Sequence, residues 1–451
     1  MSRPNMSRPG LISGITASTL LLSACMGGGG NDDSDSADQS AQGGGTVRIA
    51  SAETDANAMA ALTAAGADYE EETGTSVVFE AIPLNDIYTK VNAASGTNAE
   101  YDALITGFIG HISLFQSEDK LVPVDDVIDA LGGEEDFYDG QLLFPIEDQV
   151  WWVPFDYNIA FGFIRQDWLD EAGLEIPTTW EEMLEVAQAF SERSGDEYGL
   201  LMPLKADGAT NWITSQVLWA NEVRIFDDEW NVILDSDEML PKVVESLEFL
   251  DQLHEYMPAG ANNASYGETI EAFASGQVGM SFYSGRMLDS MIAQNPEAAE
   301  NVVAFGFPMN SGEGTAASLG YDGFGVLETE DSEEAKDFIQ WFFEERLLEL
   351  YATAPYHYLP TQRSVFDSEE WQSLPTLDLR WEEVMVPQEE FTGNPNLHSI
   401  DTDGPSVDQR SADVFQSLIF PEMFQRVVLN DEDPETVVRE SAEEIRTAAG
   451  E

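Results

Sequence analysis

Hydrophobic positions along the chain follow two different periods in turn. Short runs rich in β-branched and aromatic residues predict a strand followed by a turn within 46–53 (TVRIASAE), and strands at 75–82 (TSVVFEAI) and 101–107 (YDALITG). The segments between them, ANAMAALTAAGADYEEETG and DIYTKVNAA, have a helical pattern, and Gly74 marks the end of the first helix. Strands that alternate with helices are typical of a mostly parallel sheet with helices on its faces, so the pattern predicts an α/β fold.

The same alternation continues through the rest of the chain. Thr179 and Glu182 form a capping-box pattern at the start of a helix. The stretch from Asn211 to Met257 is predicted to be largely helical, and the segment SEEAKDFIQWFFEERLLELY predicts a strongly amphipathic helix. The body, residues 46–451, is too long for one ordinary core and indicates two domains.

Acidic residues outnumber basic residues throughout the chain. The sequence has 85 Asp and Glu against 19 Lys and Arg, a formal net charge of −66. Such a surface repels nucleic acid and anionic lipid headgroups, because both are bound through Lys and Arg. The acids are spread over the whole chain, which favours adaptation to high salt over an ordinary acidic secreted protein. This abundance also means that a pair of carboxylates gives no indication of glycosidase chemistry.

The only cysteine, Cys25, directly follows a mostly apolar run at 11–22. This run is too short to span a bilayer and is typical of a signal peptide. The motif LSAC resembles a bacterial lipobox, so we expect residues 1–24 to be a lipoprotein signal peptide and Cys25 to carry lipid; the alternative is a secretory signal with an incidental cysteine. Residues 25–45 contain almost nothing apolar and predict a disordered tether.

Patterns for catalysis, cofactors or metals are weak. The four histidines are far apart and show no metal-ligand spacing, and the sequence has no G-x-S-x-G, no Walker loop and no G-x-G-x-x-G opening a helix after a strand. Residues 399–410 resemble a calcium loop at several positions, but Arg410 stands where a bidentate Glu is needed. We therefore expect no cofactor and no metal.

Five segments in order along the chain resemble one family. They are the lipobox, YEEETGTSVVFEAI, VPFDYNIAFGFIRQDWLDEAGLEIPTTWEEM, AFASGQVGMSFYSGRML, and SEEAKDFIQWFFEE followed by YLPTQRSVF. Together they resemble the extracellular solute-binding lipoproteins of ABC importers, in the sugar-binding branch that includes maltodextrin-binding proteins. The resemblance implies a two-lobed periplasmic-binding-protein fold (a Venus flytrap) whose lobes are each a mostly parallel sheet flanked by helices. Lobe 1 would comprise 46–155 and about 316–365, and lobe 2 about 156–315 and 366–451.

The resemblance also implies a ligand site in the cleft between the lobes. Asn158 falls where maltodextrin binders place a ligand-contacting carboxylate, and Arg286 where family members carry an aromatic, so both departures argue against a maltodextrin-like ligand. Trp212 and Tyr356 lie in or beside loop-like segments. Two roles are open for them: contact with the sugar, or packing in the core (Trp212) or at the surface (Tyr356). The expected ligand-binding residues are Glu53, Phe108, Asp156, Asn158, Trp212, Tyr283, Arg286, Tyr321, Asp322 and Tyr356.

The function that the resemblance implies is capture without catalysis. We expect a lipid-anchored monomer on the outer face of the cytoplasmic membrane, at the cell surface or in the periplasm. It would bind an oligosaccharide or sugar derivative and deliver it to the transmembrane subunits of an ABC permease, with no nucleic-acid partner. Two alternatives stay open: a binder of another solute such as a polyol or an osmolyte, and a lipid-anchored polysaccharide-degrading enzyme.

Overall fold

A computed structural model describes residues 45–137, 143–193, 195–377, 380–385, 394 and 396–450. The predicted signal peptide, the lipidation site Cys25 and nearly all of the predicted tether lie outside these residues. No helix in the described ranges is both long enough and apolar enough to cross a membrane.

The first sheet has five strands in the order β2-β1-β3-β11-β4. Strands β1 (Thr46–Ser51), β2 (Ser76–Ala81) and β3 (Ala103–Thr106) are parallel, as their hydrophobic runs predict. Strand β11 (Asp322–Val326) returns from far along the chain and pairs antiparallel with both β3 and β4 (Val153–Asp156). One edge of this sheet is therefore formed by the two strands that connect directly to the second sheet, β4 leading into it and β11 returning from it.

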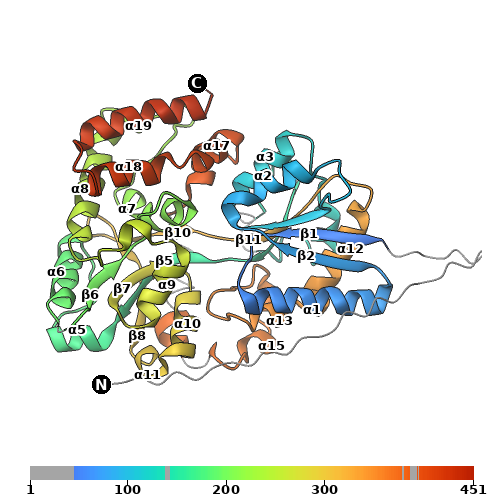
Figure 1. Cartoon of the computed structure of the whole chain (residues 1–451), viewed down its shortest axis with the longest axis horizontal. Coiled ribbons are helices and arrows are strands. Elements are labelled where there is room, and N and C mark those ends of the chain that lie inside the picture. Colours follow the sequence, from blue (N-terminus) through green and yellow to red (C-terminus); the bar gives the residue numbers. More distant parts are fainter. Residues whose placement is uncertain are drawn as a thin grey trace, which may run out of the picture. The chain divides into compact units, whose positions relative to one another are not determined.

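Helices cover both faces of the first sheet (Figure 1). Helix α1 (Ala56–Thr73) packs on β2, and α2 (Leu84–Ala94) and α3 (Ile109–Ser117) lie on the other side. The Asp55 side chain caps α1 by accepting from the backbone N–H groups of its first turn, and Gly74 ends α1 with a φ of 83°. A left-handed φ is cheap only for glycine, which is why the residue predicted to stop this helix does so.

The second sheet has seven strands among the described residues, and all of them except β12 are largely buried. Its main path is β12-β10-β5-β7-β6, while β8 pairs with β5 and β9 pairs with β10. The strands are β5 (Ile159–Arg165), β6 (Tyr198–Leu201), β7 (Val278–Tyr283), β8 (Val302–Phe305), β9 (Phe307–Pro308), β10 (Thr315–Leu319) and β12 (Leu397–His398). Its pairs are mostly antiparallel, whereas a mostly parallel sheet was expected; only β6 with β7 and β10 with β12 are parallel.

Helices α6 (Trp180–Ser191) and α9 (Tyr266–Ala274) pack on β6 and β7 of this sheet. At the start of α6, the Glu182 N–H donates to Thr179 Oγ1 over 3.1 Å, but the Glu182 carboxylate accepts from Thr178, so only half of the predicted capping box forms. The other helices are α4 (Asp125–Ala130), α5 (Gln166–Ala172), α7 (Gln216–Trp219), α8 (Met239–His254), α10 (Arg286–Gln294), α11 (Pro296–Ala299), α12 (Ser332–Glu345), α13 (Leu347–Tyr351), α14 (Arg363–Phe366), α15 (Glu369–Gln372), α17 (Gln409–Ser417), α18 (Ile419–Val428) and α19 (Pro434–Ala448).

The stretch predicted to be largely helical from Asn211 to Met257 is helical only in part. A π-helical turn at Thr210–Thr214 and α7 are followed by turns and single bridges, and a long helix returns only at α8. Glu222 and Trp230 within this interval have φ values of 54° and 68°, which a right-handed helix excludes. The local pattern did not reveal these reversals because neither residue is a glycine.

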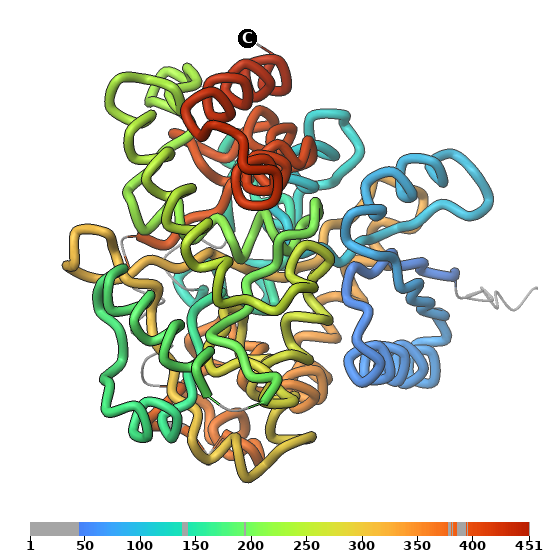
Figure 2. Tube along the Cα trace, turned by 60° about the vertical axis from the view of Figure 1, so that its left-hand side comes forward, coloured from blue at the N-terminus to red at the C-terminus, as the bar shows by residue number. Residues whose placement is uncertain are grey.

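Among the described strands the chain changes sheet three times, and the first two of these crossings lie side by side. Residues 157–158 connect β4 of the first sheet to β5 of the second, and residues 320–321 connect β10 of the second sheet to β11 of the first. In the tube view the blue strands and helices at the start of the first half stand apart from the green and red segments of the second half (Figure 2). The expected lobe boundary at about residue 316 falls within β10 (Thr315–Leu319), and the change of sheet follows at 320–321. The crossings place residues of both sheets around one space.

Candidate functional site

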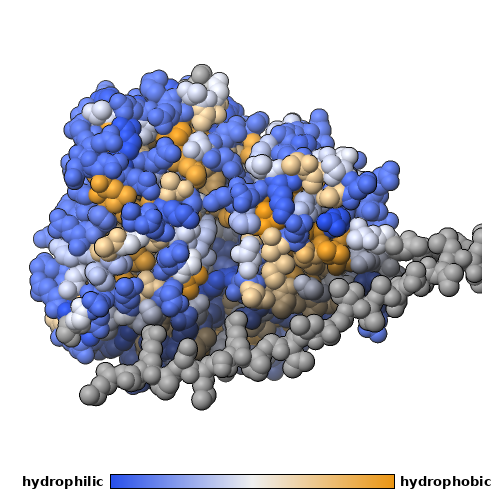
Figure 3. Space-filling model, in the orientation of Figure 1, coloured by the Kyte–Doolittle hydropathy of each residue, from blue (hydrophilic) through white to orange (hydrophobic). Residues whose placement is uncertain are grey.

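A cavity of about 530 Å³ lies at the crossings and is lined from both sheets. In the space-filling view the surface is hollowed between the part that carries β1 and the part that carries α9 (Figure 3). The lining residues are Ala52, Glu53, Thr54, Asp55, Pro83, Leu84, Asn85, Gly107, Phe108, Asn158, Lys205, Asp207, Trp212, Ser265, Tyr266, Gly267, Ile270, Tyr283, Arg286, Gly320, Tyr321, Asp322 and His357. Its volume is within the range of roughly 300–1,000 Å³ that ligand pockets occupy.

The first sheet contributes residues at the carboxyl ends of its parallel strands. Glu53 follows β1 and Phe108 follows β3, and both line the cavity as the rule for open α/β sheets predicts. Asp322 opens β11 and reaches the same space from the antiparallel neighbour of β3. Three elements that are distant in sequence thus bring two carboxylates and an aromatic ring to one side of the cavity.

The second sheet contributes an aromatic wall. Trp212 and Tyr283 meet edge to face with ring centroids 5.4 Å apart, and Tyr266 lies 5.8 Å from Tyr283. The indole N–H of Trp212 donates to the carbonyl of Leu319 at 2.8 Å, which fixes the ring against the second crossing. All three aromatic residues line the cavity, so they offer ring surface to a ligand rather than serving only as core.

The floor of the cavity is polar and centred on Asn158. Its Nδ2 donates to Asp156 Oδ1 at 2.9 Å and to Asp322 Oδ2 at 3.0 Å, so one amide holds two carboxylates. Asp156 is fully buried behind Asn158 and does not itself line the cavity. Burial raises the pKa of Asp156 well above its usual range, and it raises the pKa of Asp322 to about 7, with a further rise from the charge of Glu53.

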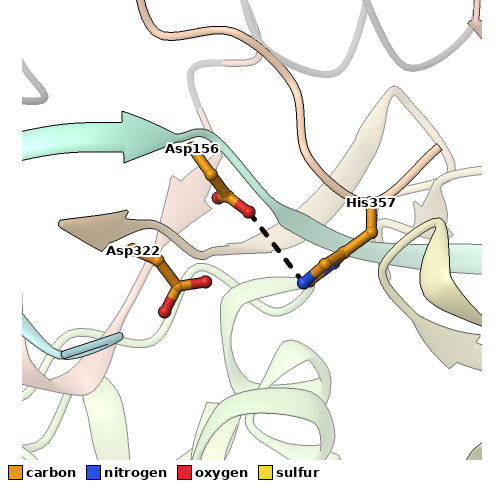
Figure 4. Close-up of side chains that lie close together, drawn as sticks. All are labelled: Asp156, Asp322 and His357. Carbon is orange, nitrogen blue, oxygen red and sulfur yellow. Dashed lines mark ion pairs between the residues drawn. The ribbon is translucent and has the colours of Figure 1, made fainter. Parts of the chain in front are cut away.

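His357 reaches the same floor from the loop after α13. Its Nδ1 lies 2.7 Å from Ser284 Oγ, and its Nε2 lies 3.9 Å from Asp156 Oδ2 (Figure 4). Burial and the charge of Arg286 lower the pKa of His357 well below its ordinary value, so the imidazole is neutral near neutral pH. His357 thus lines the cavity from a segment in which the sequence left contact with the ligand and surface packing equally open.

Arg286, the first residue of α10, connects the two sides of the cavity. Its guanidinium donates to Glu53 Oε2 at 2.7 Å and to the Tyr358 hydroxyl at 2.9 Å. The side chains of Arg286 and Glu53 are only 14% and 11% exposed, so this ion pair is largely shielded from solvent. The pair ties a helix on the second sheet to the loop after β1 on the first.

Eight of the ten expected ligand residues line the cavity, and two do not. Besides Asp156, the exception is Tyr356, whose hydroxyl donates to the carbonyl of Thr376 at 2.6 Å in the interior. Its neighbour His357 faces the cavity in its place. Sequence reasoning also missed Asp207 and Tyr266, although Asp207 lies in the loop-like segment KADGATNW, which leads to Trp212.

Two sheets joined by paired crossings, with a cavity at the crossings, define a two-lobed ligand-binding protein. The family described as bacterial extracellular solute-binding protein matches residues 52–346, and the chain belongs to this family. The membership expected from the sequence segments is therefore confirmed. The α/β two-lobed fold is confirmed too, because solved solute-binding proteins superpose on nearly the whole described body.

Three similar proteins illustrate the likeness. YcjN of Escherichia coli (strain K12), which carries the name of an ABC transporter periplasmic-binding protein, is 25% identical over 326 residues, 69% of this chain and 71% of YcjN. A solute-binding protein of Thermotoga lettingae bound to α-D-tagatose has a TM-score of 0.73 at 17% identity, covering 90% of this chain and 100% of that one. A counterpart from Agrobacterium radiobacter K84 in complex with ribitol has a TM-score of 0.71 at 19% identity, covering 90% and 98%.

Proposed function

We propose that the protein binds an extracellular carbohydrate in the cavity at the crossings and delivers it to an ABC permease. The observation that carries this proposal is the aromatic wall of Trp212, Tyr266 and Tyr283 opposite the polar floor around Asn158. Aromatic rings cover the apolar C–H face of a sugar ring, while amide and carboxylate groups take its hydroxyls. The tagatose complex of a similarly folded protein supports the same ligand class.

The ligand contacts that we propose come from both sides of the cavity. Trp212 and Tyr283 stack on the ligand, Asn158 and Asp322 hydrogen-bond its hydroxyls, and the Arg286 guanidinium meets its polar edge. Glu53, Phe108 and Tyr321 complete the wall from the first sheet and the second crossing, whereas Asp156 acts from behind Asn158 and Tyr356 supports His357. Two lobes, one built on each sheet, close over the ligand by bending at 157–158 and 320–321.

A small polyol or osmolyte is the second candidate ligand. The ribitol complex of a similarly folded protein supports it, because a polyol presents hydroxyls without a ring face. The two candidates differ in their need for the aromatic wall. A sugar ring loses contact area when Tyr283 is truncated, whereas an open-chain polyol depends more on the polar floor.

The test is calorimetric titration of a panel of mono- and oligosaccharides and polyols, guided by ligand-induced rises in melting temperature. Tyr283→Ala should weaken carbohydrate binding about tenfold or more, equivalent to about 1.4 kcal/mol. Tyr256→Ala, which removes a tyrosine outside the cavity, is the matched control and should bind like the parent. Equal affinities for the parent and a folded Tyr283→Ala variant would place the site elsewhere.

The proposal includes a non-catalytic role and attachment to the membrane by lipid on Cys25, with the acidic composition serving growth in high salt. An enzyme that degrades polysaccharides is the competing reading. Incubation of the purified protein with the carbohydrate that binds best separates the two, because a binding protein returns its ligand unchanged. Steady release of shorter products that depends on the protein would overturn the transport role.

A further inference from the structure

Three hydrogen-bond acceptors converge at the floor of the cavity. Asp156, Asp322 and His357 each offer one such atom, and the three atoms all lie within 4.8 Å of one another; His357 Nε2 lies 3.9 Å from Asp156 Oδ2 (Figure 4). The three residues come from the end of β4, the start of β11 and the loop after α13. Folding therefore assembles this cluster from segments that are far apart in the chain.

The buried carboxylate of Asp156 is only half satisfied. Its Oδ1 accepts from Asn158, but Oδ2 accepts no hydrogen bond from any described residue, although Asp156 is fully buried. The nearest opposing group, His357 Nε2, is 3.9 Å away, which is beyond hydrogen-bond distance. A buried polar atom without a partner is rare in a folded protein and points to a bound water or ion.

Hydrogen bonds from neighbouring residues hold the side chains of the cluster in the orientation that metal ligands need. When His357 Nδ1 donates to Ser284 Oγ, its Nε2 presents a lone pair towards Asp156. Asn158 Nδ2 donates to Asp156 Oδ1 and to Asp322 Oδ2, which leaves Asp156 Oδ2 to face His357 Nε2. In metal sites, the ligating histidine and carboxylates are typically held in place by hydrogen bonds to neighbouring residues of this kind.

We propose that Asp156, Asp322 and His357 bind a divalent transition-metal ion such as Zn²⁺ or Mn²⁺ at the floor of the cavity. Metal–ligand bonds of about 2.0–2.2 Å to carboxylate oxygen and imidazole nitrogen bridge two atoms that are 3.9 Å apart. One imidazole with two carboxylates is a donor set that suits zinc and manganese.

The charges around the cluster fit the same ion. Two carboxylates balance a doubly charged cation, so the occupied site is neutral and the repulsion between Asp156 and Asp322 is removed. The positive charge of Arg286 lowers the pKa of both Asp156 and Asp322. Its ion pairs, however, are made with Glu53 and Asp55. The guanidinium is thus already neutralised and does not occupy the place of the cation.

The open coordination positions face the ligand cavity. Asp322 and His357 both line it, whereas Asp156 closes the site from behind. Water fills these positions until a solute arrives, and two adjacent hydroxyls of a polyhydroxylated solute can then replace it. This site goes beyond the proposed function, since it assigns a metal ion to a protein whose fold and family imply only a solute.

The experiment is calorimetric titration of the purified, chelator-treated protein with Zn²⁺ and with Mn²⁺ in high salt. High salt screens the surface acids, which otherwise attract cations without specificity. We expect one equivalent of metal per chain. Asp156→Asn and His357→Gln should weaken binding by more than the roughly 10–100-fold that loss of an outer-shell partner causes. Asp251→Asn and His254→Gln on α8 are matched controls and should leave the affinity unchanged.

A second measurement keeps the test decisive if the cavity variants fail to fold. Co²⁺ added to the chelator-treated parent should give visible absorption bands of a nitrogen- and carboxylate-ligated ion of low coordination number. The absence of stoichiometric binding, a spectrum equal to that of hydrated Co²⁺, or equal affinity in the folded Asp156→Asn variant would each overturn the site. In parallel, the chelator-treated protein is titrated with carbohydrate. This measurement shows whether carbohydrate binding fails independently of the metal site.

Discussion

Gly320 shows how closely the two crossings approach each other. A Cβ at this position would lie 2.3 Å from both the carbonyl oxygen and Oδ1 of Asn158, and 2.4 Å from the Trp212 ring. These atoms belong to the first crossing and to the aromatic wall, so a side chain here would displace the floor and the wall together. Glycine is needed at this position because the backbone of the second crossing lies so close to Asn158 and Trp212, and not because the chain makes a left-handed turn there.

Replacement of this glycine gives a prediction for stability and binding together. Gly320→Ala should lower the free energy of unfolding by about 1–3 kcal/mol, the usual effect of overpacking, and should weaken ligand binding because Asn158 and Trp212 must move. Chemical unfolding and calorimetric titration measure the two effects. Gly260→Ala is the control, since a Cβ there meets no atom within 4 Å. A Gly320→Ala variant as stable as Gly260→Ala would show that the crossing has room to relax.

Helices α3 and α17 meet through a buried histidine. His111 on α3 is fully buried, with its Nδ1 2.7 Å from Thr106 Oγ1 and its Nε2 2.6 Å from Gln416 Nε2 on α17. Burial lowers the pKa of His111 to about 3. The contact therefore requires a neutral imidazole.

This contact predicts a loss of stability in mild acid. Because the pKa of His111 is lower in the folded than in the unfolded chain, the unfolded chain binds the extra proton as the pH falls below about 6.5. Stability is then lost progressively from there towards pH 3, by up to about 1.4 kcal/mol per pH unit. Denaturant unfolding between about pH 7 and pH 5 should show a shallower pH dependence for His111→Gln than for the parent. The control His254→Gln on α8 should keep the parental slope, and equal slopes in all three proteins would exclude His111 as the source.

The sequence predicted the regular elements of the first sheet better than the residues of the cavity. Strands β1 to β3 and helix α1 follow from local periodicity and a glycine stop, which need no knowledge of distant segments. Glu53 and Phe108 could be placed for the same reason, because each follows a predicted strand.

Other site residues depend on tertiary structure that no local pattern encodes. Tyr266 opens α9 and reaches the cavity only because α9 packs beside β7, and His357 faces the floor while Tyr356 turns into the interior. A loop offers no period from which the inward and outward residues could be told apart. The antiparallel pairs of the second sheet were missed because buried strands of either type are continuous apolar runs.

At the scale of the whole molecule, charge sets a condition on folding. The formal net charge is −66, and hydrophilic residues dominate the face seen in Figure 3. Between about 0.1 M and about 1 M salt the Debye length falls from about 10 Å to about 3 Å, which screens repulsion between exposed carboxylates. The melting temperature measured by circular dichroism should therefore rise across this range. An unchanged melting temperature would show that repulsion between surface acids does not limit the fold.

Attachment of the whole molecule to a membrane is predicted to depend on one thiol. Cys25→Ala should release the protein from the membrane fraction or leave its signal peptide uncleaved, because the lipobox cysteine is both the cleavage and the modification site. Fractionation with immunoblotting distinguishes the two outcomes, and Ser23→Ala is a control that keeps the cysteine. A processed Cys25→Ala protein that stays with the membrane would contradict lipid attachment.

The paired crossings also restrict how new ligand preferences can arise in this scaffold. Asn158 and Tyr321 belong to the segments that join the sheets, so exchanging them to suit another solute also changes the joint between the lobes. Phe108 and Tyr266 line the same cavity from outside the crossings. Directed evolution that randomises only the outer pair should therefore yield altered selectivity in proteins that still open and close, whereas libraries at the crossings should be dominated by variants with impaired movement.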